Sequence, residues 1–332
     1  MKQVQIGPGG PMVSCLGIGA MSFAEFYGPT TEENSYAILA EAMDQGVTHI
    51  DTSNVYGMGR SEKAIGQFFK QRPEARDHFH VATKAGISRD ADGNRKYDNS
   101  AEHLEAELDK SLALMGLDCV DLFYVHRREA ERPIEEVTQS LVGLQEKGKI
   151  KAFGFSEIAP SSLRRARTVA PVAAVQSEYS LSTRFVEMGL VQTCAELGTT
   201  LVAFSPVGRS LLTDDPLSKD VIPSLPFLGT NPRFIEPNYD VNLRLTQPLR
   251  DLAAELGEPT AALAIAWLVS RGDHVLPIPG TRSVSHFRDL VRGTQITLTP
   301  DVLARIDEIL PIGWAYGDRY TEDQWIGPER FC

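Results

Sequence analysis

Four polar residues in the first half of the chain have side chains that together could move a proton. They are Asp51, Tyr56, Lys84 and His126. A tyrosine, whose reference pKa is about 10, is a poor acid or base near pH 7 unless a cation lowers that pKa. Lys84 could supply the cation, Asp51 could keep a buried lysine protonated, and His126 could donate a hydrogen bond to a carbonyl oxygen. This set predicts hydride delivery to a carbonyl carbon while the oxygen receives a proton.

Each of these residues also has an ordinary structural explanation, as a turn cap, a packed rim residue or a solvated charge. Their positions favour chemistry, because Asp51, Lys84 and His126 each end an apolar run and Tyr56 follows closely after Asp51. In barrels of parallel strands, catalytic groups lie at the C-terminal ends of the strands. We therefore expect one pocket to hold all four side chains.

The elements that must position these residues alternate between amphipathic helices and short apolar runs. In the first helix, Ile38, Leu39 and Ala42 fall on one face, Thr30 and Glu33 can form a capping box, and Gly46 ends the helix. Eight runs are predicted strands, at 16–19, 48–51, 79–84, 118–125, 150–155, 173–178, 199–204 and 274–278. Because these runs are almost entirely apolar, both faces of the sheet should be buried. The pattern predicts an α/β fold, a (β/α)8 TIM barrel with extra helices.

Three segments lie outside this alternation, and we expect all of them to belong to a single domain over 1–332. Residues 2–15 are predicted to form an N-terminal hairpin that plugs the bottom of the barrel. The long loop 206–243, rich in Pro, Gly and Asn, is expected to be a functional lid. The tail 311–332 is expected to lie over the C-terminal face together with this loop, as a lid, an oligomer contact or a packed extension. Its aromatic residues are Trp314, Tyr316, Tyr320, Trp325 and Phe331.

Composition excludes several classes of protein. The net charge of −11 argues against nucleic-acid binding, and no apolar run is long enough to cross a membrane. The cysteines Cys15, Cys119, Cys194 and Cys332 are scattered singly, which suits a reducing, cytoplasmic compartment. His78 and His80 have no third ligand near them in the sequence, so we expect no metal site.

Seven ordered strings along the chain resemble the aldo-keto reductases. They are IDTSNVYG, ATKAG, FYVHR, GFSE, QSEYSL, AFSPVGR and IPGTRS. FYVHR, QSEYS and NPRF are most similar to the pyridoxal-reductase-like and auxin-induced-type branch. The resemblance implies a (β/α)8 barrel that binds NADP(H) across its C-terminal face. It also implies that the four residues above are the catalytic tetrad of a carbonyl reductase, with Tyr56 as general acid.

The same resemblance implies the cofactor-binding residues. Ser156 and Gln176 would hold the nicotinamide carboxamide, and the ring of Phe204 would stack on the nicotinamide. The residues along the pyrophosphate would be Ser205, Val207, Gly208 and Arg209. The turn that meets the adenosine 2′-phosphate would be Gly280, Thr281, Arg282 and Ser283.

Three positions depart from the family pattern. Glu157, His286 and Leu290 stand where relatives often carry Asn, Arg and Asn. The first departure weakens the expected amide contact, and the other two weaken recognition of the adenine end. NAD(H) is therefore kept as a weaker alternative to NADP(H). The Gly17-Ile18-Gly19 string lacks the third glycine of a dinucleotide-binding fingerprint and is discounted.

Two other functions are compatible with a barrel of this kind. A lyase would use Lys84 to form a Schiff base, and a regulatory subunit would bind the cofactor without turnover. For a reductase the substrate is left open among aldehydes, ketones and sugars, and so is the oligomeric state. Phe26 and Tyr27 suggest an apolar pocket, whereas Arg127 and Arg128 leave room for an anionic substrate unless Glu129 or Glu131 pairs with them.

Overall fold

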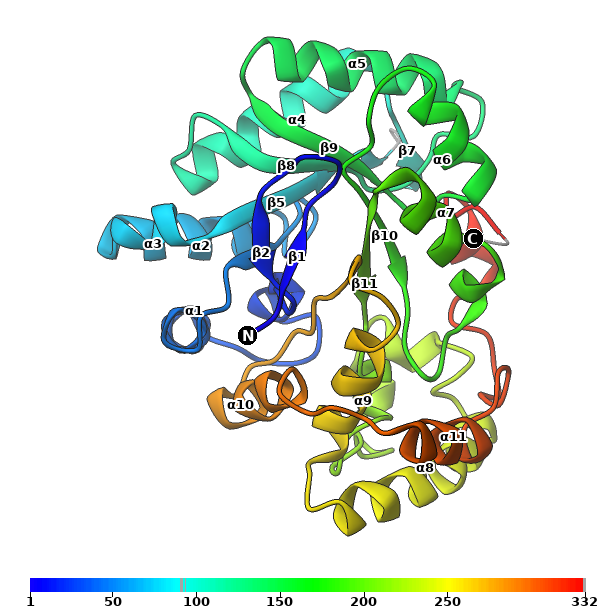
Figure 1. Cartoon of the computed structure of the whole chain (residues 1–332). Helices are drawn as coiled ribbons and strands as arrows, with labels where there is room; N and C mark the ends of the chain where they lie inside the picture. The colour runs from blue at the N-terminus through cyan, green and yellow to red at the C-terminus, as the bar shows by residue number, and fades with distance from the viewer. Residues whose placement is uncertain (90–91, 93, 331–332) are drawn as a thin grey trace.

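Eight parallel strands form the centre of the molecule (Figure 1). The computed structural model describes residues 1–89, 92 and 94–330. In spatial order the strands are β3 (Ile18–Gly19), β4 (His49–Asp51), β5 (His80–Ala85), β8 (Val120–Val125), β9 (Ile150–Ser156), β10 (Ala174–Glu178), β11 (Thr200–Phe204) and β12 (Val275–Pro277). Each strand is parallel to its neighbours. All eight predicted strands, and the (β/α)8 barrel, are confirmed.

The barrel closes where the first strand meets the chain around the end of β12. The backbone N–H of Gly17 donates to the Pro277 carbonyl and that of Gly19 to the Pro279 carbonyl, each at 2.9 Å. A Cβ atom on Gly19 would lie 2.6 Å from the backbone oxygen of Ile278, closer than side chains allow. The glycines of this string therefore permit barrel closure, which explains their spacing without a dinucleotide-binding turn.

Helices surround the strands (Figure 1). They are α1 (Glu32–Asp44), α2 (Arg60–Gln71), α3 (Glu74–His78), α4 (Ala101–Met115), α5 (Ile134–Glu146), α6 (Pro160–Arg167), α7 (Leu190–Leu197), α8 (Asn238–Glu255), α9 (Thr260–Val269), α10 (Val284–Gly293) and α11 (Pro300–Ile309). Their buried faces form one apolar layer with the outer faces of the strands. The capping prediction for α1 was wrong by one residue: Thr31 is the N-cap and its side chain accepts from the Asn34 N–H.

The N-terminal hairpin closes the bottom of the barrel, as predicted. It consists of β1 (Gln3–Gln5) paired antiparallel with β2 (Met12–Ser14). Val4 and Val13 of the hairpin share an apolar cluster with side chains from inside the barrel. The hydroxyl of Thr200, at the start of β11, donates to the Gln5 carbonyl at 2.7 Å. Since the hairpin blocks the N-terminal ends of the strands, the C-terminal ends form the open face.

The long loop and the tail reach that open face. The loop after β11 ends earlier than predicted, because α8 begins at Asn238. It holds its own apolar cluster, which includes Leu211, Leu228 and Phe234. In the tail, the Trp314 indole N–H donates to the Leu181 carbonyl at 2.7 Å. The predicted tail residue Phe331 lies outside the described residues.

A short hairpin, β6 (Ile87–Arg89) with β7 (Arg95–Tyr97), follows β5 on the same open side. Within the described residues, no single helix is both long and apolar enough to span a membrane, although the sharply bent pair α8 and α9 together meets that length and composition.

Candidate active site

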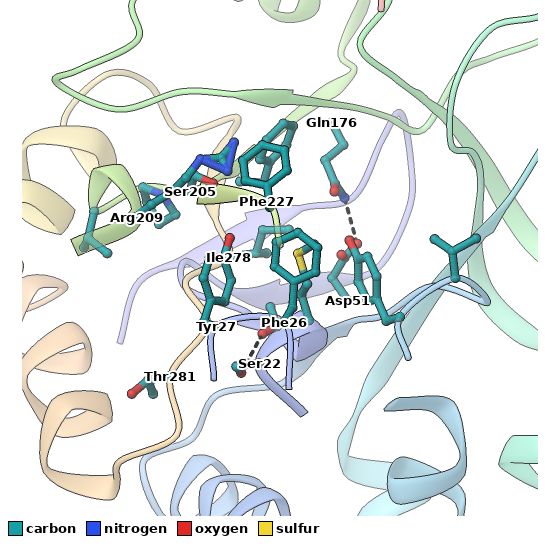
Figure 2. Close-up of a pocket in the computed structure, with 18 of the residues that line it drawn as sticks. Ser22, Phe26, Tyr27, Asp51, Gln176, Ser205, Arg209, Phe227, Ile278 and Thr281 are labelled. Carbon is teal, nitrogen blue, oxygen red and sulfur yellow. Dashed lines mark hydrogen bonds between the residues drawn. The ribbon is translucent and has the colours of Figure 1, made fainter. Parts of the chain in front are cut away.

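A cavity of about 1080 Å³ opens among the C-terminal ends of the strands (Figure 2). Three of the four predicted catalytic residues line it, namely Asp51, Tyr56 and His126. Lys84 is fully buried behind them. Of the predicted cofactor residues, Gly208 alone does not line the cavity, and the lining ones are Ser156, Gln176, Phe204, Ser205, Val207, Arg209, Gly280, Thr281, Arg282 and Ser283. Residues far apart in the sequence thus share one cavity.

Strand register brings the reactive side chains together. Asp51 is the last residue of β4, and Lys84 lies near the end of the adjacent strand β5. The loop after β4 stays against β5, because the Asn54 N–H donates to the Lys84 carbonyl at 3.2 Å. A turn then follows, in which the Tyr56 N–H donates to the Ser53 carbonyl at 3.1 Å. This turn places the Tyr56 ring beside Lys84.

Lys84 sits between a carboxylate and a phenol. Its Nζ donates to Asp51 Oδ1, to the Thr52 carbonyl at 2.7 Å and to the Tyr56 hydroxyl at 3.4 Å. The second oxygen of Asp51 accepts from the Gln176 amide at 2.7 Å (Figure 2). An ammonium group has three donors, so each has a partner here. The predicted Asp51–Lys84–Tyr56 arrangement is therefore present in the structure.

Burial dominates the electrostatics of these groups. It lowers the pKa of Lys84 and raises that of Asp51, and in each case the partner's charge opposes the shift. The pKa of Tyr56 is raised, first by burial and then by Asp51, while Arg127 lowers it. We expected Lys84 to lower the pKa of Tyr56, but Asp51 neutralises that cation by direct contact. The phenol consequently keeps its proton near pH 7 in the protein alone.

His126 lies beside Tyr56 as a buried, neutral imidazole. Its ring centroid is 5.9 Å from that of Tyr56, at nearly a right angle. Burial holds the pKa of His126 well below its usual value of 6.5, and the nearby charges of Arg127, Lys84 and Arg95 lower it further. Nδ1 lies 3.0 Å from the Ser53 hydroxyl. When that hydroxyl donates to Nδ1, the proton is on Nε2, where it can meet an acceptor.

The residues expected to meet the carboxamide already have protein partners. The Gln176 amide donates to Asp51, and the Ser156 hydroxyl accepts from Arg127 at 2.9 Å. Ser156 can still donate its own proton, and the Gln176 amide oxygen is an acceptor. They offer one donor for the carbonyl oxygen of a primary carboxamide and one acceptor for one of its two N–H groups. Glu157 does not line the cavity, because its carboxylate is held by Arg319 and by the Glu178 N–H.

The turn after β11 is built from backbone in unusual conformations. Ser205, Gly208, Arg209 and Ser210 all have positive φ, of 52°, 58°, 54° and 84°. Such residues cluster at ligand-binding turns, where successive N–H groups can converge on an anion. The Arg209 side chain turns away from this role: it pairs with Glu178 at 2.8 Å and lies over the Phe227 ring. Figure 2 shows Arg209, Ser205 and Phe227 grouped on one side of the cavity.

The turn after β12 leads into α10. Ser283 is the N-cap of this helix, and its hydroxyl accepts from the His286 N–H. Arg282 is exposed, and its guanidinium donates to the Pro29 carbonyl at 2.8 Å. The helix N-terminus and one exposed cation thus lie at this end of the cavity, a combination that favours phosphate. His286 and Leu290 line the same end.

Sequence reasoning missed a buried charge cluster beneath the cavity wall. Glu157 and Glu178 contact three guanidinium groups, those of Arg209, Arg233 and Arg319. All five side chains are at most 8% exposed. The cluster joins the ends of β9 and β10 to the long loop and to the tail. No local spacing connects these five positions, so the sequence carries no short-range signal for the cluster.

The tail also contributes directly to the cavity wall. Tyr320 and Gln324 line the cavity beside Phe26, Tyr27 and Phe227. The Tyr320 hydroxyl accepts from Arg127 at 3.2 Å. The aromatic tail is therefore part of the site, which decides against a mere surface-packed extension.

The other histidines considered have protein partners. His78 Nε2 lies 2.9 Å from the Val47 carbonyl, and His80 Nδ1 lies 2.9 Å from His49 Nδ1. Within the described part of the chain, no group of three His, Cys, Asp or Glu side chains is arranged to hold a metal ion.

Known proteins share both the sequence and the fold of this chain. The model of the aldo/keto reductase family matches residues 15–311. An aldo-keto reductase of Schizosaccharomyces pombe, whose name specifies NADP(+), is 36% identical over 316 residues, which are 94% of this chain and 93% of the relative. A probable aldo-keto reductase of Glycine max is 34% identical over 321 residues, covering 96% of this chain and 92% of the relative.

Two solved structures are similar over nearly their whole length. A glycerol dehydrogenase from Gluconobacter oxydans superposes with a TM-score of 0.80 at 26% identity, covering 93% of this chain and 94% of that one. An aldo-keto reductase from Bacillus halodurans, in its holo form, gives 0.77 at 25% identity, covering 98% of this chain and 99% of the other. With a family model matching most of the chain and relatives above a third identical, the chain belongs to the aldo/keto reductase family.

Proposed function

We propose that this protein reduces aldehydes or ketones to alcohols with NADP(H), and that Tyr56 is the general acid. The observation that carries the proposal is the contact of one buried lysine with both Asp51 and the Tyr56 hydroxyl, at the wall of a large cavity. Membership of the family and the NADP(+) in one relative's name support it.

The cavity suits an extended dinucleotide. Its volume of about 1080 Å³ slightly exceeds the roughly 300–1,000 Å³ of ordinary ligand pockets. At one end lie Ser156 and Gln176, suited to a carboxamide, with the ring of Phe204 in the same wall. At the other end are the positive-φ turn 205–210 and the N-terminus of α10, both suited to phosphate. NADPH bound there would supply the hydride.

The proton follows a path made by the chain itself. The His126 Nε2–H binds the carbonyl oxygen of the substrate and brings it beside the Tyr56 hydroxyl. Tyr56 gives its proton to that oxygen as negative charge develops on it. The Lys84 ammonium then stabilises the tyrosinate across the 3.4 Å contact, and Asp51 keeps Lys84 protonated. The raised pKa of Tyr56 ensures that the proton is present at the start.

The contacts of Lys84 argue against a Schiff-base lyase. Its three donors are directed to three oxygens, so the nitrogen lone pair needed for attack on a carbonyl is occupied by a proton. A lyase would also leave Asp51 and Tyr56 without a task. A regulatory subunit that binds NADPH without turnover differs from the reductase only in rate.

One assay distinguishes these functions. Purified protein is mixed with NADPH and a panel of aldehydes, ketones, sugars, quinones and pyridoxal, and the loss of NADPH absorbance is followed. The reductase predicts consumption with at least one carbonyl class, and NADH should serve less well. NADPH binding without consumption across the panel would favour the regulatory subunit, and a borohydride-trapped adduct on Lys84 would favour the lyase.

We also propose a single cytoplasmic domain over 1–332.

A further inference from the structure

Arg127 is a charged residue of the cavity wall to which the proposed reaction gives no role. It follows His126 directly, is half-buried and lines the cavity with Tyr56 and His126. Its three hydrogen bonds all go to uncharged oxygens: the His126 carbonyl at 2.7 Å, the Ser156 hydroxyl at 2.9 Å and the Tyr320 hydroxyl at 3.2 Å. Within the described residues, no carboxylate pairs with it.

Three other arginines near this wall do have counter-ions. Arg128 pairs with Glu329 at 3.4 Å, and Arg209 pairs with Glu178 at 2.8 Å. Arg132, a few residues along the same loop, pairs with Glu129. Of the two carboxylates considered for a rim pairing, Glu129 is held by Arg132, and Glu131 is exposed and makes no ion pair with Arg127 within the described residues. A guanidinium left in a cavity wall with neutral partners only is an anion-binding group, because burying an unneutralised charge is costly.

The donors of Arg127 are arranged for an anion. A guanidinium has five N–H donors, and the three bonds use both on Nη1 and one on Nη2. The Nε donor and the second Nη2 donor have no partner among the described residues. A guanidinium can present Nε–H and Nη2–H together to two oxygens of a carboxylate or phosphate, as a bidentate pair. The three existing bonds hold the plane of the guanidinium in place.

Like Arg127, a second charged residue near the reactive end of the cavity is positive. Arg95, on β7, lines the cavity, is exposed and has no carboxylate partner among the described residues. Both arginines lie close enough to lower the pKa of His126, and Arg127 also lowers that of Tyr56. Two carboxylates of the cavity wall belong to this end: Asp51 is neutralised by Lys84, and Glu107, which accepts from the Asn54 amide, pairs with Lys110. In a chain of net charge −11, this local excess of positive charge is a feature of the site.

We propose that Arg127, assisted by Arg95, binds a negatively charged group on the substrate, so that the preferred substrates are aldehydes or ketones bearing a carboxylate or phosphate. This inference rests on the proposed reductase activity and specifies its substrate class. The anionic group would be held beside the carbonyl that Tyr56 and His126 engage. Arg127 would then be a specificity-determining residue, and Arg95 would add longer-range attraction at the cavity mouth.

The test uses a matched pair of aldehydes that differ in one charge. NADPH-dependent kcat/KM is measured for 4-carboxybenzaldehyde and for its methyl ester, with wild-type protein and Arg127→Gln. The wild type should favour the carboxylate. The ratio of the two values should fall about 10- to 150-fold in the variant, the range for loss of a charge-assisted hydrogen bond. Arg95→Gln should lower the ratio less, and added salt should lower it further in the wild type.

Three comparisons separate the possible results. Arg165→Gln removes an exposed arginine that pairs with Glu135 outside the cavity, and it should leave the ratio as in the wild type. Arg127→Lys keeps the positive charge without the paired N–H donors of the guanidinium, and it should give an intermediate ratio. If Arg127→Gln fails to fold, this variant still tests the proposal. A second pair, glyceraldehyde 3-phosphate and glyceraldehyde, shows whether phosphate or carboxylate is preferred.

Several results would overturn the assignment. If the wild type prefers the neutral member of both pairs, or if Arg127→Gln leaves the ratios unchanged, Arg127 does not bind substrate anions, although turnover of the ester would still uphold the reductase. If both substrates lose activity equally and the Kd for NADPH rises in parallel, Arg127 acts by positioning Ser156. Absence of NADPH consumption with every aldehyde would instead refute the proposed function, and this inference with it.

Discussion

Replacing Arg319 by methionine should free the C-terminal tail from the barrel. Arg319 is 2% exposed and pairs with Glu157, which is fully buried. Its guanidinium also lies over the rings of Tyr320 and Trp325, each 4.7 Å away. Methionine preserves most of the stem but leaves the Glu157 carboxylate with the Glu178 N–H as its remaining donor.

The expected cost follows from burial. Removing one partner of a buried ion pair destabilises a protein by roughly 3–5 kcal/mol, because the other charge is left without compensation. An exposed pair contributes about 0–1 kcal/mol. The matched control is Arg165→Met, since Arg165 makes a bidentate contact with Glu135 at 2.7 and 2.8 Å but is 55% exposed. Glu157→Gln should recover part of the loss when combined with Arg319→Met.

Urea unfolding measures the change in free energy, and limited proteolysis detects release of the tail. Because Tyr320 lines the cavity, a released tail should also raise KM for the carbonyl substrate. If Arg319→Met costs no more than Arg165→Met and the tail stays resistant to protease, the ion pair does not anchor the tail. The assigned role of the buried cluster would then be wrong.

Three further predictions concern Lys84, the contact of Arg282 with the cofactor, and the dependence of stability on pH. Lys84→Met should lower kcat on the order of 10²-fold or more and shift the basic limb of the pH profile, because the tyrosinate loses its cation; a normal kcat with an unchanged profile would contradict this. Arg282→Ala should weaken NADPH binding about 10- to 150-fold and leave NADH nearly unchanged, as fluorescence titration of both cofactors can show; equal weakening would mean that Arg282 meets a group common to both. Burial lowers the pKa of His80 to about 4 and holds that of His126 well below 6.5, so the unfolded chain binds more protons than the native one below pH 6.5. The free energy of unfolding should therefore be highest above pH 6.5 and should fall as the pH is lowered toward 4. Urea titrations that give equal free energies of unfolding at pH 7 and pH 5 would exclude neutral, buried imidazoles.

The fold was predictable because its signals are local and repeated. Glycines such as Gly46, Gly116 and Gly198 have positive φ at the ends of helices, and each is followed by a buried strand. The closing contact between Gly19 and the Pro279 carbonyl was not predictable, since it joins positions at opposite ends of the barrel sequence. Gly17 and Gly19 belong to no local turn that would explain from the sequence alone why glycine is needed there.

The candidate site was predictable where strand ends decide position. Asp51, Lys84 and His126 follow from the rule that parallel strands present their C-terminal ends at one rim. Side-chain partners do not follow from that rule. The pairing of Arg209 with Glu178, and the absence of a carboxylate beside Arg127 among the described residues, depend on which long-range neighbours fill each space. The direction in which the pKa of Tyr56 is shifted depended likewise on the contact between Lys84 and Asp51.

The most direct test of the account is the change Tyr56→Phe, measured by kcat for NADPH-dependent reduction of the best aldehyde found. Phenylalanine preserves the ring packed near His126 and removes the one proposed proton donor. Loss of a general acid should lower kcat on the order of 10²–10⁴-fold, with the Kd for NADPH unchanged within about twofold. A variant that retains more than about a third of the wild-type kcat would contradict the assignment of Tyr56 as general acid.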